Sequence, residues 1–197
     1  MVDARTLAVY GERAEDYARM VDSDRPDPDL AAFVAALPKG ARVLDLGCGP
    51  ARASSVMRAA GLVPDPVDAS PEMVDLANRL FDIGARVASF DDIDAQEIYD
   101  GVYANFSLLH APRSDLPRHL SAIARALKPL GHFHIGMKIG EGEDRDALGR
   151  AYTYYTVPEL RGLLEDAGLL CTSEKLGQDK GLAGTTDPFV ILRARKL

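Results

Sequence analysis

The stretch VLDLGCGPA, residues 43–51, decides the fold of this chain. Its apolar start predicts a buried strand, and Gly47 and Gly49 predict a tight turn immediately after that strand. Glycine has no side chain, so such a turn lets backbone N–H groups approach a ligand closely. Residues 52–60 predict a helix that ends at Gly61, so the segment is a strand, a glycine turn and a helix.

Strand-like and helix-like segments alternate along the rest of the chain. We expect strands at 42–46, 63–67, 86–90, 100–106, 132–139, 169–176 and 188–195, and helices at 5–21, 29–37, 52–60, 71–81, 114–127 and 157–168. The polar, glycine-rich segment 140–151 predicts a loop that is long enough to be functional. Alternation that ends in two successive strands predicts an α/β sandwich with a mostly parallel sheet and one antiparallel strand.

The first predicted helix carries Tyr10 and Tyr17 on one face, because apolar residues recur there at intervals of three and four. Pro26 lies among several aspartates and predicts a break after that helix. We therefore divide the chain into an N-terminal helical arm, residues 1–28, and one domain, residues 29–197.

Composition and charge narrow the class of partner. The chain has 197 residues, of which 47% are hydrophobic and 27% charged, and this suits one globular domain with a sizeable core. A net charge of −7 without a basic cluster argues against nucleic acid and anionic membranes. Cys48 and Cys171, with the four histidines, match no zinc or disulfide pattern. We expect a cytoplasmic monomer or homodimer without a metal, whose partner is a small molecule.

In this order of elements the chain resembles the class I S-adenosylmethionine-dependent methyltransferases. The residues that carry the resemblance are VLDLGCGPA (43–51), VDASPEMVDLAN (67–78), DGVYANFSLLH (100–110), ARALKPLGHF (124–133) and YYTVPELRGLLEDAGL (154–169). The resemblance implies a Rossmann-like three-layer sandwich whose seven-stranded sheet has the order 3-2-1-4-5-7-6, with strand 7 antiparallel. It also implies transfer of a methyl group from S-adenosylmethionine to a small molecule by in-line displacement, with S-adenosylhomocysteine as product. SLLH and GR-x-Y-x-Y-Y (149–155) look like a bacterial small-molecule group.

The glycine turn and two aspartates suit this cofactor chemically. Amides at the carboxyl end of a parallel strand can hold a carboxylate, here that of the methionyl group. Asp45 is a candidate for organising the turn and favouring the amino group, and Asp68 ends the second strand, where a carboxylate accepts ribose hydroxyls. Both aspartates have turn capping as the alternative. The full set of expected cofactor residues is Tyr10, Tyr17, Asp45, Gly47, Cys48, Gly49, Asp68, Ala69, Ser70, Met73, Phe90, Asp91, Asp92, Asn105 and Phe106.

Several members of this set have an alternative structural role. Met73 lies beside the adenine or ribose by resemblance, or it belongs to the helix core. Phe90 is expected to stack on adenine, whereas Asp91 and Asp92 either read the adenine edge or are solvated turn residues. Ala51 stands where the family pattern has a third glycine, so a positive φ there would strain the turn.

Two other functions share parts of this pattern. A nicotinamide-dependent oxidoreductase also has a glycine-rich turn followed by an acidic residue at the next strand. That fingerprint requires a small residue three positions after the second glycine, where this chain has Arg52. The final strand pair also favours the methyltransferase. A noncatalytic module that binds the cofactor or its product is not excluded by any sequence feature.

The acceptor side is less defined, because methyl transfer needs a base only when the acceptor is protonated. His110 is the candidate base or orienting group, with a packing role as the alternative, and His132 and His134 are assigned to structure. The candidate acceptor residues for a small anionic or polar molecule are Lys138, Arg150, Tyr152, Tyr154 and Tyr155; the alternative is that Lys138 is solvated and the tyrosines pack the loop. By resemblance, the arm tyrosines Tyr10 and Tyr17 form a lid over the cofactor; the alternative is that they only bury their helix. Asn105-Phe106-Ser107 replaces the Asn-Pro-Pro-Tyr motif of nucleobase methyltransferases, which argues against a DNA or RNA base.

Overall fold

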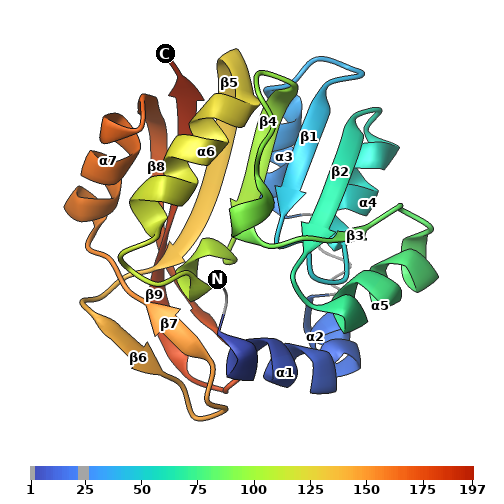
Figure 1. Cartoon of the computed structure of the whole chain (residues 1–197), viewed down its shortest axis with the longest axis vertical. Helices are drawn as coiled ribbons and strands as arrows, with labels where there is room; N and C mark the ends of the chain where they lie inside the picture. Colours follow the sequence, from blue (N-terminus) through green and yellow to red (C-terminus); the bar gives the residue numbers. More distant parts are fainter. Residues whose placement is uncertain (1–2, 22–26) are drawn as a thin grey trace.

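The computed structural model describes residues 3–21 and 27–197 as an α/β sandwich (Figure 1). The strands are β1 (Arg42–Leu46), β2 (Val63–Asp68), β3 (Arg86–Val87), β4 (Tyr99–Asn105), β5 (Leu127–Lys138), β6 (Glu143–Arg145), β7 (Ala151–Thr153), β8 (Leu169–Lys180) and β9 (Thr186–Lys196). The helices are α1 (Ala4–Glu12), α2 (Ala14–Val21), α3 (Pro28–Ala35), α4 (Arg52–Ala59), α5 (Pro71–Phe81), α6 (Leu116–Ala126) and α7 (Val157–Asp166). Two short 3-10 turns, η1 (Phe90–Asp92) and η2 (Leu108–His110), follow β3 and β4.

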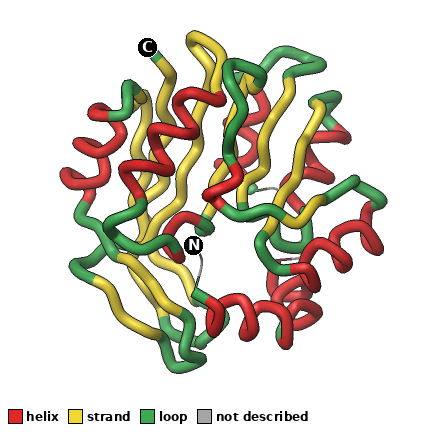
Figure 2. The backbone as a smooth tube through the Cα atoms, in the orientation of Figure 1, coloured by secondary structure: helices red, strands yellow, loops and turns green. Residues whose placement is uncertain are grey.

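The main sheet has seven strands in the order β3-β2-β1-β4-β5-β9-β8 (Figure 2). Strands β3, β2, β1, β4 and β5 are parallel, and β9 is antiparallel to both of its neighbours. The labels β6 and β7 belong to a separate two-stranded sheet. Counted within the main sheet alone, β8 is the sixth strand and β9 the seventh, so the predicted order 3-2-1-4-5-7-6 with an antiparallel strand 7 is confirmed.

The core lies on both faces of this sheet. On one face α6 and α7 pack against β4, β5 and β9 through fully buried residues that include Ile123 and Leu164. On the other face Phe33 of α3 and Met57 of α4 pack against Val43 of β1. Figure 1 shows α6 and α7 in front of the sheet and α3 and α4 behind it. Burial on both faces explains why successive residues of a central strand, such as Val102, Tyr103 and Ala104 of β4, are all apolar and buried.

Two helix starts that the sequence predicts are formed as expected. Ser70 precedes α5, and its side chain accepts a hydrogen bond from the N–H of Met73 at 3.3 Å. Thr156 and Glu159 form a reciprocal capping box at the start of α7, with Thr156 N–H donating to Glu159 at 2.9 Å. Such caps satisfy amides that have no partner inside the helix, so they are visible in the local sequence.

The predicted helix 5–21 is wrong, because the structure divides it into α1 and α2. Arg13 separates them, with φ −114° and ψ 19°, and its N–H bonds to the carbonyls of Gly11 and Val9. Both helices then pack against α5. The sequence periodicity does not change at the bend, so the sequence carries no signal for it. The predicted break at Pro26 lies outside the described residues.

The predicted loop 140–151 is also wrong in part, because it contains β6 and the first residue of β7. The β6 strand, Glu143-Asp144-Arg145, is fully charged and therefore lacks the apolar alternation by which a strand is recognised. Its pairing with β7 is decided by tertiary contacts. The third strand is shorter than expected, since β3 ends at Val87 and Phe90 begins η1. No helix among residues 3–21 and 27–197 is long and apolar enough to cross a bilayer.

Ala51, the residue in place of the third glycine, has φ +59° and ψ 30° and is fully buried. A left-handed conformation costs an alanine about 1–2 kcal/mol. Its methyl group packs in a small cluster with Val74, Ala77 and Ala85, and burying one such group contributes about 0.8 kcal/mol. The turn therefore keeps the geometry of a glycine turn, and packing offsets much of the strain.

We expect Ala51→Gly to change the free energy of unfolding by less than about 1 kcal/mol, because relief of strain is opposed by the lost methyl contact and by the greater freedom of glycine in the unfolded chain. Ala51→Val should destabilise by about 2 kcal/mol or more, since a branched side chain fits neither the backbone conformation nor the filled space. Urea unfolding measures both. A valine variant as stable as the wild type would contradict this account.

Candidate active site

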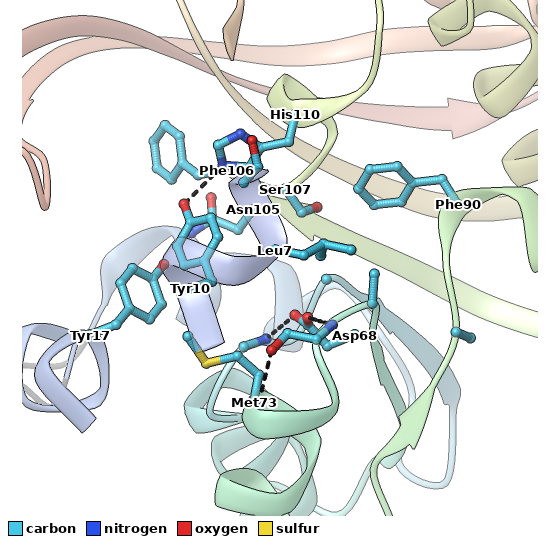
Figure 3. Close-up of a pocket in the computed structure, with 16 residues that line it drawn as sticks. Leu7, Tyr10, Tyr17, Asp68, Met73, Phe90, Asn105, Phe106, Ser107 and His110 are labelled. Carbon is cyan, nitrogen blue, oxygen red and sulfur yellow. Dashed lines mark hydrogen bonds between the residues drawn. The ribbon is translucent and has the colours of Figure 1, made fainter. Parts of the chain in front are cut away.

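A cavity lies at the carboxyl edge of the parallel strands, where Figure 3 shows its lining side chains. This edge is where open α/β sheets bind ligands. The arm, the glycine turn, the end of β2 and the segment after β4 all contribute. The lining residues are Thr6, Leu7, Tyr10, Tyr17, Gly47, Gly49, Asp68, Ala69, Ser70, Met73, Ala88, Phe90, Asn105, Phe106, Ser107 and His110.

The glycine turn is held in place by the neighbouring strand. The N–H groups of Gly47 and Cys48 donate to the carbonyl of Val67 at 2.8 and 2.9 Å. Gly47 has φ +74°, and a Cβ on it would lie 2.3 Å from the Cβ of Ser107. Only glycine therefore fits at this position, for reasons of both conformation and space.

Asp68 joins the turn to the end of β2. Its Oδ2 accepts from Gly49 N–H at 2.8 Å and its Oδ1 accepts from Ser70 N–H at 2.9 Å. Burial raises the pKa of this carboxyl group, and both amide hydrogen bonds oppose that shift. The two amides fix the orientation of the carboxylate at the cavity wall.

Asp45 and Cys48 lie behind the turn, and neither is part of the cavity lining. Asp45 is 3% exposed and accepts a hydrogen bond from Ser54 Oγ at 2.7 Å, which ties β1 to α4. Burial raises the pKa of Asp45 to about 6. Burial also raises the pKa of the Cys48 thiol. The observed contact of Asp45 is thus structural, and its action on a cofactor amino group stays a prediction.

At the end of the cavity formed by η1, only Phe90 of the expected Phe-Asp-Asp group lines the wall. Asp91 forms an ion pair with Arg118 at 2.6 Å. Asp92 accepts from both the N–H and the hydroxyl of Ser89 at 2.8 Å, which caps η1. The observed contacts of Asp91 and Asp92 are therefore those of turn residues, which was the alternative to a contact with adenine. Met73 lines the cavity and is also 2% exposed within a helix cluster, so its two expected roles coexist.

The segment after β4 is fixed by contacts with neighbouring strands. Asn105 Oδ1 accepts from His134 Nε2 at 3.1 Å, Phe106 has φ +56°, and Ser107 Oγ donates to the carbonyl of Leu46 at 2.6 Å. His134 stacks on Tyr103, and burial lowers its pKa to about 3. The sequence predicted Asn105 and Phe106 as site residues and missed the lining residues Thr6, Leu7, Ala88 and Ser107. For Ser107 the only signal was its place after β4.

Helix α1 of the arm lies beside the β6–β7 hairpin (Figure 1), and both arm helices contribute residues to the cavity lining. Tyr10 and Tyr17 both line the cavity, with an edge-to-face contact at 5.5 Å between ring centres. Asp3 accepts two hydrogen bonds from Arg145, each at 2.9 Å, and Thr6 Oγ1 accepts from the N–H of the first β7 residue at 2.8 Å. Arm and hairpin, which are far apart in sequence, therefore form one wall of the site.

His110 uses both ring nitrogens in hydrogen bonds within the protein. Nδ1 lies 2.6 Å from the carbonyl of Ala151, and Nε2 lies 2.8 Å from Tyr10 Oη (Figure 3). A carbonyl only accepts, so Nδ1 carries the proton and Nε2 accepts from the tyrosine. Burial lowers the pKa of His110 to about 4, and the ring is therefore neutral near pH 7.

The five expected acceptor residues form a packed cluster beside His110, and none of them lines the cavity described above. Lys138 pairs with Asp187 at 2.6 Å, and its Nζ lies 4.0 Å from the centre of the Tyr152 ring. Arg150 is 2% exposed and pairs with Asp146 at 2.6 Å. The ring of Tyr154 stacks on that of Tyr152, and Tyr155 lies under the guanidinium of Arg113. Both cations are thus matched by carboxylates, so an anionic acceptor is not favoured by either.

No group of three or more His, Cys, Asp or Glu side chains gathers around a potential metal position within the described part of the chain.

The family model for a methyltransferase domain matches residues 17–174. The chain belongs to this family. The match covers the glycine turn, Asp68, the segment after β4 and the β6–β7 hairpin. It decides against the nicotinamide-dependent oxidoreductase that the glycine turn alone left open.

Named relatives share this domain. A ubiquinone biosynthesis O-methyltransferase from Xanthomonas axonopodis pv. citri is 35% identical over 130 residues, which are 57% of this chain and 53% of the relative. The chain spans about half the length of the curated relatives it matches. A crystal structure of a Burkholderia thailandensis 1,6-didemethyltoxoflavin-N1-methyltransferase, with bound 1,6-didemethyltoxoflavin and S-adenosylhomocysteine, is 25% identical with a TM-score of 0.78, covering 98% of this chain and 88% of that one.

The fold by itself does not decide the reaction. The [4+2]-cyclase SpnF is 21% identical with a TM-score of 0.68, over 85% of this chain and 80% of that one. Because one fold supports different chemistries, function has to be argued from the site.

We expect Gly47→Ala to destabilise the protein more than Gly142→Ala, although the two glycines have the same φ of +74°. The conformational cost, about 1–2 kcal/mol, is common to both. A Cβ at Gly142 has nothing within 4 Å, whereas a Cβ at Gly47 meets Ser107, which adds about 1–3 kcal/mol. Equal losses of stability in urea unfolding would show that the contact with Ser107 is not restrictive.

The raised pKa of Asp45 predicts a specific pH dependence. In the folded protein this carboxyl group stays protonated up to about pH 6, whereas its ordinary pKa is 3.8, so folding takes up a proton between these values. The stability it contributes is present below about pH 4 and is lost as the pH rises through 6, by roughly 2–3 kcal/mol. Asp45→Asn should remove this fall. The unfolding free energy of the wild type, measured from pH 4 to 7, should therefore fall relative to that of Asp45→Asn as the pH rises. Parallel curves would contradict the assignment.

Proposed function

We propose that this chain binds S-adenosylmethionine and transfers its methyl group to a small molecule by in-line displacement, leaving S-adenosylhomocysteine. The observation that carries the proposal is the 2.8 Å hydrogen bond from Gly49 N–H to Asp68, which joins the glycine turn and the carboxylate of the next strand at one cavity. Family membership and the neighbour with bound S-adenosylhomocysteine support it.

The residues at the cavity fit this cofactor. Asp68 offers carboxylate lone pairs to ribose hydroxyls, and Phe90 and Met73 offer apolar surfaces to adenine. Gly49 has no side chain, so its backbone faces the ring of Tyr17 directly; a Cβ at this position would lie 3.4 Å from that ring. Helix α4 begins after Ala51 without a side-chain cap, and an uncapped helix start suits the methionyl carboxylate.

The acceptor meets the cofactor at the wall formed by Tyr10, Phe106 and His110, and the arm acts as a lid because its two tyrosines line the cavity. Bound cofactor supplies the methyl group, and the residues of this wall exclude water and orient the acceptor. One similar protein is named for methyl transfer to oxygen and another for transfer to nitrogen, so both atoms are candidates for the acceptor of this protein. Two free cysteines suit a reducing cytoplasm.

Titration calorimetry with S-adenosylmethionine and S-adenosylhomocysteine tests the proposal directly. We expect both to bind, and absence of heat with both at high micromolar concentration would overturn it. Asp68→Asn should weaken binding by about 1–3 kcal/mol, because charged hydrogen bonds to the ribose are lost.

Asp91→Asn is the matched control for Asp68→Asn. The carboxylate of Asp91 pairs with Arg118 and lies outside the cavity lining, so affinity should not change. An equal loss in both variants would mean that the effect of Asp68 is indirect.

Release of S-adenosylhomocysteine separates an enzyme from a binding module. The protein is incubated with S-adenosylmethionine and a bacterial metabolite extract, and the product is followed by mass spectrometry. Multiple turnovers support transfer, whereas tight binding without turnover favours the noncatalytic module.

A further inference from the structure

Tyr10 and His110 belong to a hydrogen-bond chain whose direction is determined at both ends. Arg150 Nη1 donates to Tyr10 Oη at 2.8 Å, Tyr10 donates to His110 Nε2 at 2.8 Å, and His110 Nδ1 donates to the carbonyl of Ala151 at 2.6 Å. A guanidinium has no acceptor and a carbonyl has no donor. Because Nδ1 of His110 carries the proton, Nε2 needs a donor, and the hydroxyl proton of Tyr10 points to it. The side chain of Tyr152 is a further hydrogen-bonding neighbour of Tyr10.

Arg150 is held rigidly at the start of this chain. Its Nε and Nη2 donate to Asp146 Oδ2 at 2.9 and 2.6 Å, and its backbone N–H donates to Asp146 Oδ1 at 2.9 Å. The guanidinium also lies 5.0 Å from the centre of the Tyr10 ring. Because Arg150 is 2% exposed and absent from the cavity lining, it is a positioning residue and does not contact the acceptor.

The chain connects two spaces. Tyr10 and His110 line the cofactor cavity, and His110 also lines a second, more open hollow between η2 and the β6–β7 hairpin. The carboxylates of Glu143 and Asp144 line that hollow. A proton that reaches His110 from the cofactor cavity thus lies next to a solvent-accessible space with negative charge.

We propose that Tyr10 and His110 form a proton relay for an acceptor whose nucleophilic atom carries a hydrogen: a hydroxyl, a thiol or a non-basic ring N–H. The inference rests on the proposed function. A lone pair of the acceptor atom forms the bond to the methyl carbon, and the C–S bond breaks with its electron pair left on sulfur. The acceptor proton moves to Tyr10 Oη while the original Tyr10 proton moves to His110 Nε2. The positive charge of the sulfonium is thereby transferred to the imidazolium.

The order of these events follows from the environment of His110. Burial, with a smaller effect of the Arg150 and Lys138 charges, lowers the pKa of His110 to about 4, and the hydrogen bond to the Ala151 carbonyl and the charge of Asp146 oppose this shift. The rings of Tyr10 and Tyr152 face the imidazole. So weak a base does not ionise a free hydroxyl. After methylation the acceptor atom carries a positive charge and is a much stronger acid than an imidazolium, so the relay accepts the proton at that stage. Tertiary amines and thioethers, which release no proton, gain nothing from the relay.

Tyr10→Phe removes the hydroxyl and retains the ring, and Tyr99→Phe is the matched control, because the Tyr99 hydroxyl bonds to Asp65 outside the cavity. The first measurement is ¹⁵N NMR of the histidine rings in the full chain with S-adenosylhomocysteine added. We expect the Nδ1-protonated tautomer for His110 in the wild type. The Nε2 signal should shift in Tyr10→Phe and stay unchanged in Tyr99→Phe.

The second measurement is turnover with the acceptor found in the metabolite extract. Tyr10→Phe should lower kcat about 100-fold, with the KM for S-adenosylmethionine unchanged, whereas Tyr99→Phe should leave both constants unchanged. Arg150→Met should raise the pKa of His110 in the NMR titration, since it removes a neighbouring cation. A purely structural role of Arg150 would not move that pKa.

An Nε2-protonated His110, or an Nε2 signal that does not respond to Tyr10→Phe, would overturn the relay whether or not an acceptor has been found. An acceptor identified as a tertiary amine or a thioether would also overturn it. Each of these outcomes leaves S-adenosylmethionine binding intact, so failure of the relay is distinguishable from failure of the proposed function.

Discussion

The structure depends on the hydrogen bonds that hold the turn after β1 against the end of β2. The carbonyl of Val67 accepts from Gly47 and Cys48, and the carboxylate of Asp68 accepts from Gly49. These bonds bring the start of α4 to the carboxyl edge of the sheet, and the absence of a side chain at Gly47 lets Ser107 approach from β4. The carboxyl ends of β1, β2 and β4 thereby lie around one cavity, and the residues that follow these strands form part of its lining.

The acceptor side is built on a different principle. It depends on buried polar side chains that satisfy one another across the arm, η2 and the β6–β7 hairpin. Arg150 and Asp146 come from the hairpin, Tyr10 from α1 and His110 from the end of η2. Buried polar groups need partners, so these elements stabilise one geometry when all are in contact. The contacts of the arm with η2 and the hairpin therefore fix the wall that holds Tyr10 and His110.

Local sequence predicted those features that arise from contacts between near neighbours. The helix starts at Ser70 and Thr156 are formed as expected, because a cap involves residues three positions apart. The strand order followed from a resemblance spread over nearly the whole chain. The bend at Arg13 and the β6–β7 hairpin were missed, since neither changes the hydrophobic period. Asp45 and Asp91 were expected at the cofactor, but their observed partners are Ser54 and Arg118.

By itself, the sequence determined that a parallel strand ends in a glycine turn and that an acidic residue ends the next strand, because both follow from residue types at fixed spacing. The tertiary structure alone decided which of these groups face the cavity, since Asp68 and Asp45 are equally acidic in sequence and differ only in what surrounds them. It also decided that Ala51 adopts a left-handed conformation, where packing around its methyl group compensates the strain. The proton position on His110 is likewise a tertiary property, because the carbonyl of Ala151 and the hydroxyl of Tyr10 reach the ring from segments distant in sequence.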